Sequence, residues 1–262
     1  MPRSLFTAAS GMQVQQTNID NIANNLANAS TAGFKRSRVE FQDILYQNLR
    51  TSGAQSSSST NLPVGLQVGL GSRAVSTERI FSQGDFQQTD NPLDLVISGK
   101  GFFQIRQPSG EIAYTRAGSF HLDANGQIVN ADGFALDPQI SIPATATSIT
   151  IAQDGTVSVA LAGQTQPSTL GQIQLVNFAN PSGLEAIGRN LFRQTQSSGQ
   201  PLTGVAGTNS LGTIDQGFVE QSNVNIVEEL VNMIVAQRAY ETNSKVVKAS
   251  DEMMQIVNNV KS

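Results

Sequence analysis

The side chains that could do chemistry are few in this sequence and lie apart from one another. His121 is the only histidine, and Phe120 and Leu122 flank it in a segment that alternates like a strand. Because the chain has no cysteine, it offers neither a thiol nucleophile nor a Cys/His metal site. Neighbouring acidic residues such as Glu228 and Glu229 point about 100° apart on a helix, so they do not face each other as an acid and base pair. The sequence therefore predicts no catalytic residue and no metal ligand.

Two glycine-containing segments resemble ligand-binding loops. Residues 69–74 match the G-x-G-x-x-A form of the dinucleotide fingerprint, which requires a helix directly after it. Residues 75–81 alternate like a strand instead. Asp123 begins a stretch that hints at a calcium loop, but an EF-hand needs Gly at the sixth position and Glu at the twelfth, where this chain has Ile128 and Phe134. We interpret both segments as connections within a β region and expect no cofactor.

The balance of charge argues against a nucleic-acid-binding protein. The 262 residues carry 16 basic and 20 acidic side chains, a formal net charge of -4. Nucleic-acid binding depends on Lys and Arg side chains that neutralise phosphates, so we expect no nucleic-acid partner. The densest basic cluster, Lys35, Arg36 and Arg38, is interpreted as solvated or as lining an interface. No stretch approaches the roughly 18 apolar residues of a membrane-spanning helix, and the N-terminus lacks the apolar run of a cleaved Sec signal peptide.

Long helices are predicted at both ends of the chain. Apolar residues recur every seven positions near each end, which is typical of a coiled-coil seam. Ser222 or Asn223 can cap the second helix. Isolated helices gain little stability from propensity, so both apolar rows must be buried against each other and against neighbouring molecules. The first row is Leu5, Met12, Ile19 and Leu26, with Ile22 beside it, and the second is Ile226, Met233, Tyr240, Val247 and Met254, with Leu230 and Ile234 beside it.

A row of amides runs along the first helix. Asn18, Asn21, Asn25 and Asn28 are three or four residues apart, so they share one helix face. Asparagine is a poor helix former, but amides that face another subunit can pair their donors and acceptors and fix the register of packing. We interpret the row as a subunit interface; the alternative is a solvated polar face.

The middle of the chain, about residues 73–204, is predicted to be antiparallel β structure. Asn125-Gly126 and Asp154-Gly155 separate short alternating runs and fit tight hairpin turns. Residues 51–61 are Ser-rich and cannot bury a core, so they are expected to act as a linker unless a partner orders them. The predicted fold class is α+β, with paired long N- and C-terminal helices flanking a mainly antiparallel β middle domain.

Several segments resemble the family of flagellar rod and hook proteins. Residues 22–36 resemble the N-terminal signature of that family, and residues 222–241 resemble its C-terminal signature. Residues 99–103, 114–120 and 183–185 with 190–192 resemble motifs of its β domain. The resemblance covers nearly the whole chain and implies a helical inner tube domain (1–34 and 218–262), a connecting region (35–72 and 205–217) and an outer β domain (73–204).

One segment distinguishes members of the family. The stretch from Tyr46 to Pro63 resembles the one that marks the distal rod member and is generally absent from hook protein. The resemblance implies that neighbouring subunits order this stretch and that it makes the rod straight and stiff. The residues expected to do so are Tyr46, Leu49, Arg50, Leu62 and Pro63.

The resemblance also implies a function and partners. We expect a structural subunit that polymerises helically into the distal rod, a periplasm-spanning drive shaft that transmits motor torque to the hook. The expected partners are other copies of the chain, proximal rod and hook-end axial proteins, the surrounding P and L rings, the rod cap and the type III export apparatus. The alternatives are a hook or proximal rod protein or, from another class, a secreted β-rich binding module or adhesin. The expected subunit interface comprises Leu5, Met12, Asn18, Ile19, Asn21, Ile22, Asn25, Leu26, Asn28, Phe34, Leu230, Met233, Ile234, Tyr240, Val247 and Met254.

Overall fold

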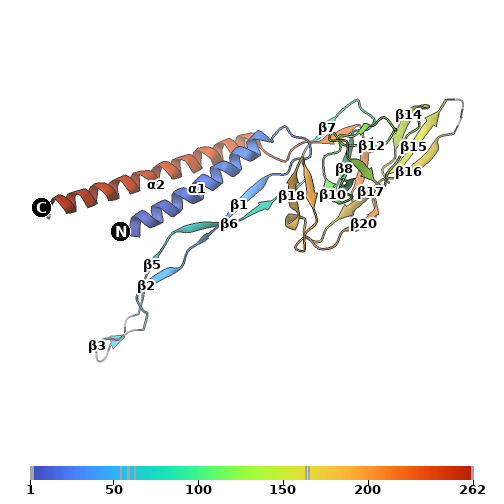
Figure 1. The fold of residues 1–262 in the computed structure, drawn as a ribbon. Coiled ribbons are helices and arrows are strands. Elements are labelled where there is room, and N and C mark those ends of the chain that lie inside the picture. The colour runs from blue at the N-terminus through green and yellow to red at the C-terminus, as the bar shows by residue number, and fades with distance from the viewer. Residues whose placement is uncertain are drawn as a thin grey trace. The chain divides into compact units, whose positions relative to one another are not determined.

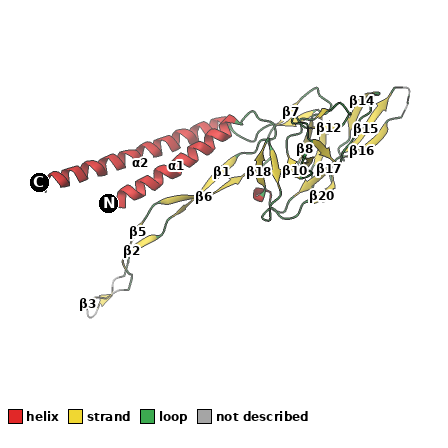
Figure 2. Ribbon diagram, viewed as in Figure 1, coloured by secondary structure: helices red, strands yellow, loops and turns green. Residues whose placement is uncertain are grey.

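The structure of the chain is α+β, with helices at its two ends and antiparallel strands between them (Figure 2). This agrees with the predicted fold class. No helix within the described ranges is long and apolar enough to cross a membrane. The structure is a computed structural model that describes residues 3–53, 55–57, 60–61, 63–162, 164 and 166–260. Leu62, expected among the stiffening residues, lies outside the described residues.

The chain divides into two compact units. Unit one consists of residues 1–27, 37–78 and 225–262, and unit two of residues 28–36 and 79–224. Unit one therefore contains both helices, and unit two contains the core of the β structure. The three-part division drawn from the family resemblance stays a prediction.

Two helices form the first part of unit one. Helix α1 (Arg3–Ala27) and helix α2 (Ile226–Val260) run side by side, and both chain ends lie at the same end of the pair (Figure 1). Asn225 caps α2, because its side-chain oxygen accepts the backbone N–H groups of Val227 at 3.1 Å and Glu228 at 3.2 Å. The cap predicted at Ser222 or Asn223 was wrong by two or three residues, since an amide directly before the helix reaches the free N–H groups.

A two-stranded ribbon forms the second part of unit one and is drawn from blue to teal in Figure 1. It is built from three successive antiparallel pairs, and no third strand joins it among the residues that the structure describes. The Ser-rich stretch expected to be a linker contains the outermost pair. The pairs are β1 (Ser37–Asp43) with β6 (Ser72–Arg79), β2 (Tyr46–Arg50) with β5 (Leu66–Gly69), and β3 (Gln55–Ser57) with β4 (Thr60–Asn61).

Unit two is built from antiparallel strands around one large sheet. In that sheet the order is β11-β12-β13-β9-β10-β19-β18, and β17 joins β9 to β20. Beside it lie the sheet β14-β15-β16 and the pairs β8–β21 and β7–β22. The strands are β7 (Phe86–Gln88), β8 (Leu95–Ser98), β9 (Phe102–Arg106), β10 (Ile112–Thr115), β11 (His121–Leu122), β12 (Ile128–Val129), β13 (Ala135–Asp137), β14 (Ala146–Ile151), β15 (Thr156–Leu161), β16 (Ser168–Gln172), β17 (Gln174–Asn177), β18 (Glu185–Gly188), β19 (Leu191–Arg193), β20 (Leu202–Val205), β21 (Thr213–Gln216) and β22 (Phe218–Glu220), with a 3-10 turn at Pro181–Gly183.

Both predicted hairpins are confirmed. Strands β11 and β12 pair across the turn that contains Gly126, and β14 and β15 pair across the turn that contains Gly155. The two glycines have φ values of 76° and 85°, a region that favours glycine. Asp123 and Asp154 stabilise the turns, because each carboxylate accepts a backbone N–H group two residues further on, at 2.8 and 2.9 Å.

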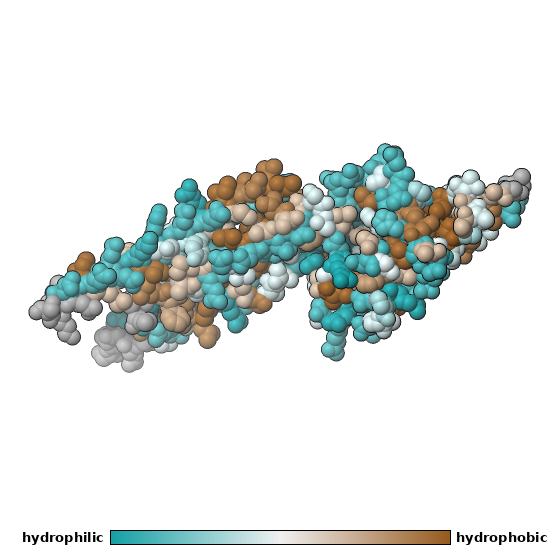
Figure 3. All heavy atoms as spheres, turned by 45° about the horizontal axis from the view of Figure 1, so that its top comes forward, coloured by the Kyte–Doolittle hydropathy of each residue, from teal (hydrophilic) through white to brown (hydrophobic). Residues whose placement is uncertain are grey.

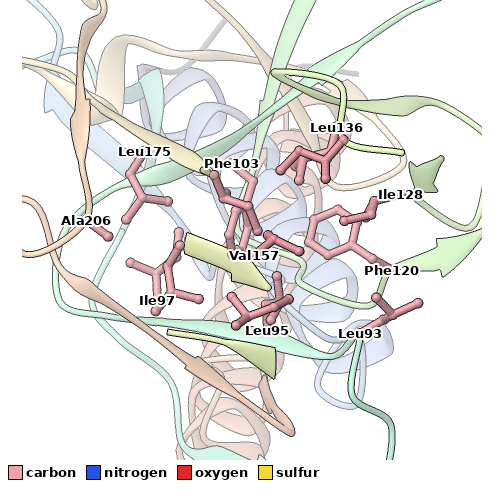
Figure 4. Packing of buried hydrophobic residues seen from close by; sticks show 14 of the residues in the cluster. Leu93, Leu95, Ile97, Phe103, Phe120, Ile128, Leu136, Val157, Leu175 and Ala206 are labelled. Carbon is pink, nitrogen blue, oxygen red and sulfur yellow. The ribbon is translucent and has the colours of Figure 1, made fainter. Parts of the chain in front are cut away.

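The core of unit two lies on both faces of β9. Successive side chains of a strand point to opposite faces, and here both faces are covered. Phe103 packs into the main cluster with Phe120, Leu95 and Val157 (Figure 4). Phe102 points the other way into a second, aromatic cluster, where edge-to-face ring contacts have centroid distances of 4.8 to 6.1 Å. The aromatic members of that cluster are Phe81, Phe102, Tyr114, Phe178 and Phe192, and Val176 and Leu184 pack with them.

Candidate functional site

The two helices of unit one meet along a row of small and polar residues. Three close contacts lie at successive intervals of seven and fourteen residues along α1. Their partners on α2 have the same intervals but follow in the opposite order along the chain, so the helices are antiparallel and their contacts repeat every seven residues. The contacts are Ser4 with Ser250, whose hydroxyl oxygens lie 3.3 Å apart, Gly11 with Asn243, and Asn25 with Glu229, where the amide donates to the carboxylate at 3.4 Å.

The closest approach is at Gly11. A Cβ atom at this position would lie 2.8 Å from the Asn243 side-chain nitrogen, so only glycine fits without a shift of that side chain. The same register places Asn18 opposite Ala236, which is 2% exposed. We call this row of small and polar contacts the helix seam.

The apolar heptad rows predicted from the sequence lie beside the helix seam. On α1, each residue of the row that begins at Leu5 directly follows a residue of the helix seam. On α2, Met233 lies three residues before the seam residue Ala236, and the rest of its row has the same displacement. Small seam residues let the helices approach closely, which leaves the larger apolar residues at the edges. Within one chain the closest contacts are therefore not those of the predicted apolar rows. Leu5, Met12, Ile19, Leu26, Met233 and Val247 are half-buried, whereas Leu230, Ile234, Tyr240 and Met254 are exposed.

The predicted row of amides has two roles in the structure. Asn25 is buried, its amide donates to the Ser37 carbonyl at 2.8 Å, and its oxygen accepts the Ser37 N–H group at 3.0 Å. Asn21 binds the same residue, since it donates to the Ser37 carbonyl at 2.8 Å. Both amides therefore fix the start of β1 on α1. Asn25, at 1% exposed, has no surface left for a neighbouring subunit, whereas Asn21 is half-buried. Asn18 and Asn28 are half-buried.

Two more of the expected interface residues are buried inside the chain. Ile22 is 4% exposed within unit one. Phe34 is 6% exposed within unit two, where the Arg79 guanidinium lies 6.0 Å from the centre of its ring. Both residues contribute to the packing of their own units.

An uncovered apolar face runs along the first half of α2. Its residues occur in adjacent pairs that repeat every four positions, so they form two neighbouring rows on one side of the helix. Their exposed fractions range from 44% to 71%. Figure 3 shows apolar surface on the part of the molecule that contains the helices. This α2 apolar face consists of Ile226, Val227, Leu230, Val231, Ile234 and Val235.

The sequence analysis missed half of the α2 apolar face. Val227, Val231 and Val235 do not fall on the seven-residue row, although each directly follows an apolar residue of the predicted helix. The available signal was the four-residue spacing of apolar pairs, which indicates a wider apolar face than a coiled-coil seam requires.

The ribbon also exposes large apolar side chains. Leu45 is 83% exposed, Tyr46 55% and Leu49 47%, and Arg50 and Pro63 are exposed as well. The Tyr46 ring lies beside Gly69 on the opposite strand, and the neighbouring Asp43 carboxylate raises the pKa of its phenol. A two-stranded hairpin alone is marginally stable in water. Its apolar side chains therefore mark a surface that favours contact with another molecule.

The remaining candidate residues form no catalytic or metal site. His121 lies exposed on β11, and no group of His, Cys, Asp or Glu among the described residues is arranged to hold a metal ion. Lys35 is neither solvated nor part of an exposed surface: it is fully buried in unit two beside Glu220. Burial lowers the pKa of Lys35, against the opposing influence of the Glu220 carboxylate. The prediction for this lysine was wrong because its partner is distant in sequence.

Matches to known protein families define the class of protein to which the chain belongs. Residues 5–35 match the family described as "Flagella basal body rod protein", residues 96–159 match "Flagellar hook protein FlgE/F/G D1 domain", and residues 215–260 match "Flagellar basal body rod FlgEFG protein C-terminal". These matches cover most of both helices and the strands of unit two from β8 to β15. The helix pair and the β unit are thus those of an axial structural component of the bacterial flagellum.

Individual relatives define the family more closely. The flagellar basal-body rod protein FlgG of Buchnera aphidicola subsp. Acyrthosiphon pisum is 55% identical over 252 residues, 96% of this chain and 97% of that protein. The FlgG of Caulobacter vibrioides is 52% identical over 99% of this chain and all of that protein, and the FlgG of Borreliella burgdorferi is 48% identical over 100% and 99%. The chain belongs to the FlgG family of flagellar basal-body rod proteins.

Membership of this family gives the chain a structural role. It is a subunit of the flagellar distal rod in the basal body, it assembles there with other axial proteins, and it is not an enzyme. Among solved structures, the Helicobacter pylori flagellar hook protein FlgE2 is similar at 14% identity over 71% of this chain and 43% of that one, with a TM-score of 0.26, a likeness too weak to define the fold.

Proposed function

We propose that copies of this chain polymerise helically through the α2 apolar face and the ribbon to form a straight shaft that transmits motor torque to the hook. The α2 apolar face carries the proposal. Its six residues are on the surface of a single chain, whose helix seam is already closed by small and polar residues. Apolar area of this kind gains about 25 cal/mol per Å² when it is covered.

The mode of assembly follows from the uncovered surfaces. The α2 apolar face and the ribbon differ from each other in shape and composition, so each meets a different surface on the next copy. A contact between two different surfaces that does not close into a ring produces an open helical polymer. In such a polymer the paired helices form a coiled-coil-like inner tube, as the family resemblance implies.

The residues proposed for the subunit interface are those that a single chain leaves at least partly accessible. The apolar rows beside the helix seam contribute on both helices, and Asn18, Asn21 and Asn28 contribute amides. The ribbon adds the proposed stiffening residues Tyr46, Leu49, Arg50 and Pro63, and the proposal also includes Leu62, which lies outside the described residues. The interface residues on the helices and just beyond α1 are Leu5, Met12, Asn18, Ile19, Asn21, Leu26, Asn28, Leu230, Met233, Ile234, Tyr240, Val247 and Met254.

The proposed partners follow from a place in the rod. They are other copies of the chain, the proximal rod and hook-end axial proteins, the P and L rings, the rod cap and the type III export apparatus. The proposed location is the periplasm-spanning rod, reached without a Sec signal peptide. Nucleic acid and membrane insertion have no part in the proposal.

A substitution on the α2 apolar face tests the proposal. Val231→Asp places a charge at the centre of the face, where 54% of the valine is exposed, so the single chain keeps its packing. We expect cells with this variant to lack complete rods and to be non-motile, because burial of an unpaired carboxylate opposes association. Basal bodies isolated from cells that express only the variant are counted by negative-stain electron microscopy.

The matched control is Ala249→Asp, an exposed position on the same helix that lies eighteen residues beyond Val231 and outside the α2 apolar face. We expect normal rods from this control and unchanged circular dichroism for both variants. Normal swimming with Val231→Asp, or assembly of the purified chain only into a closed dimer or tetramer, would contradict the proposed polymer.

A further inference from the structure

Glu220 lies at the centre of a buried group of charges in unit two. Its carboxylate accepts hydrogen bonds from Lys35 Nζ at 2.5 Å, from Arg116 Nε at 2.9 Å and from the backbone N–H of Gly84 at 2.9 Å. The side chains of Glu220 and Lys35 are completely buried, and that of Arg116 is 5% exposed. Glu220 therefore joins three segments that are far apart in the sequence.

The partners of Glu220 extend the network to backbone groups. Lys35 Nζ also donates to the Ser82 carbonyl at 2.6 Å. Arg116 donates to the carbonyls of Gly99 and Gly101 at 2.9 and 2.8 Å, and Gly101 directly precedes β9. Through Arg116 the charges are thus attached to the central sheet of unit two.

Asn223 joins the same segments a second time. Its side-chain oxygen accepts the Arg36 N–H group at 2.7 Å. Its amide donates to the carbonyls of Ile80 at 2.9 Å and Ser82 at 3.1 Å, and to the Ser82 hydroxyl at 2.9 Å. One amide side chain therefore bridges residues near positions 36, 80 and 223.

These segments are the covalent connections of unit two. The chain enters or leaves this unit at residues 27–28, 36–37, 78–79 and 224–225. Lys35 and Arg36 precede the second of these points, Ile80 to Gly84 follow the third, and Glu220 and Asn223 precede the fourth. Three of the four connections are therefore joined by two side chains.

Stability alone does not account for buried charges at this place. Replacing a buried ion pair by packed apolar residues is often neutral or stabilising, whereas removal of one partner is strongly destabilising. Charged and amide side chains make directional hydrogen bonds, and each of these bonds forms only in one arrangement of the segments that it joins. The same network is well suited to prevent the segments from moving separately.

We propose that Glu220 and Asn223 form a load-sharing clamp, which distributes force that arrives through any one of three connections over all three and into the sheet at β9. The inference rests on the proposed function in one respect, since motor torque is the force that would load the connections. Without the clamp, residues 218–220 keep the pairing of β22 with β7 and the backbone hydrogen bond from the Gly33 N–H group to the Glu220 carbonyl at 2.8 Å, but they lose the side-chain hydrogen bonds that join them to Lys35, Gly84 and Arg116.

Hydrogen exchange of the purified chain tests the mechanical coupling. Asn223→Ala removes the amide bridge at a half-buried site, and Glu220→Gln keeps the shape of the side chain but removes its charge. We expect exchange to accelerate together, by roughly tenfold, in all three segments, 34–36, 80–84 and 218–223. Amides of β9 and β15 should keep their wild-type rates, which shows that the core is folded.

Matched controls remove similar groups that join no connections. Asn180→Ala loses an amide bond to the Ser197 carbonyl, and Glu185→Gln loses an exposed ion pair with Arg193. Both should leave exchange in the three segments unchanged. Acceleration confined to the segment that carries the substitution would overturn the clamp, as would no acceleration in Asn223→Ala, which is the variant less prone to misfold.

Motor rotation under load provides the functional readout. In cells, rods with Asn223→Ala should assemble in normal number but fail as external viscosity rises, whereas rods with Asn180→Ala should rotate as wild type. Equal load tolerance of the two variants would also overturn the clamp. If wild-type chains built no torque-bearing rod, the proposed function would fail, while the exchange experiment would still decide the coupling.

Discussion

Gly11 shows how one residue sets the geometry of the helix pair. The Asn243 side chain occupies the space that a side chain at position 11 would need. Glycine is an unfavourable residue in a helix interior, by about 1 kcal/mol relative to alanine. Its presence here is explained by the close approach of α2, which outweighs that local preference.

The conflict between helix propensity and space gives a prediction for Gly11. Gly11→Ala in the natural chain should destabilise the helix pair by about 1–3 kcal/mol, because the added methyl group overpacks the helix seam. In an Asn243→Ala background the same change should stabilise it by up to about 1 kcal/mol. Thermal unfolding followed by far-ultraviolet circular dichroism measures both differences. An effect of the same sign in both backgrounds would exclude a direct conflict between the two side chains.

Single residues also mark the limit of what the sequence reveals. Lys35 and Glu220 are 185 residues apart, and neither has a neighbour in sequence that indicates a buried partner. The hairpins at Gly126 and Gly155 could be predicted, since the turn chemistry is contained within a few adjacent residues. Pairing of distant charges depends on the tertiary structure alone.

At the scale of elements, the helices could be predicted but the way they face each other could not. Seven-residue periodicity identifies a helix with an apolar side, and both helices are present. A seam made of Ser4, Gly11 and Asn243 gives no hydropathy signal, so the sequence predicts that the more conspicuous apolar rows form the contact between the helices. The interface interpretation of Asn25 has the same origin, because an amide row looks alike whether its partner is Ser37 or another subunit.

The ribbon is the element whose role is easiest to separate from folding. Leu49→Asp changes a residue that is 47% exposed in the single chain, so thermal stability should change by less than about 0.5 kcal/mol. Complete rods should nevertheless be lost, because the proposed contact with a neighbouring copy would contain an unpaired carboxylate. Melting of the purified chain and electron microscopy of basal bodies provide the two measurements.

Asn48→Asp is the control for that experiment, since it adds the same charge at an exposed polar position one residue away on β2. Rods should form with this variant. Failure of both variants would show that any charge on the ribbon is harmful, and normal rods with Leu49→Asp would remove this residue from the interface.

At the scale of the whole molecule, the surfaces proposed for assembly, the α2 apolar face and the ribbon, expose large apolar side chains, while the net charge of the chain is only -4. Association should therefore respond to solvent quality more than to ionic screening. Sulfate, which strengthens apolar burial, should lower the concentration at which the purified chain begins to polymerise, whereas sodium chloride at equal ionic strength should change it little. Light scattering during concentration measures the threshold. A similar response to both salts would indicate that charge pairs dominate the contacts.

The helix seam has a consequence for the supply of subunits. In the helix pair, the small seam residues lie inside and larger apolar residues lie on the surface. Copies of the chain can therefore associate with one another before they reach the end of the rod. Free copies compete with the growing end for one another, and the competition increases with the square of their concentration. Synthesis should therefore keep pace with growth, because a stock of finished subunits would turn into aggregate instead of serving as a reserve.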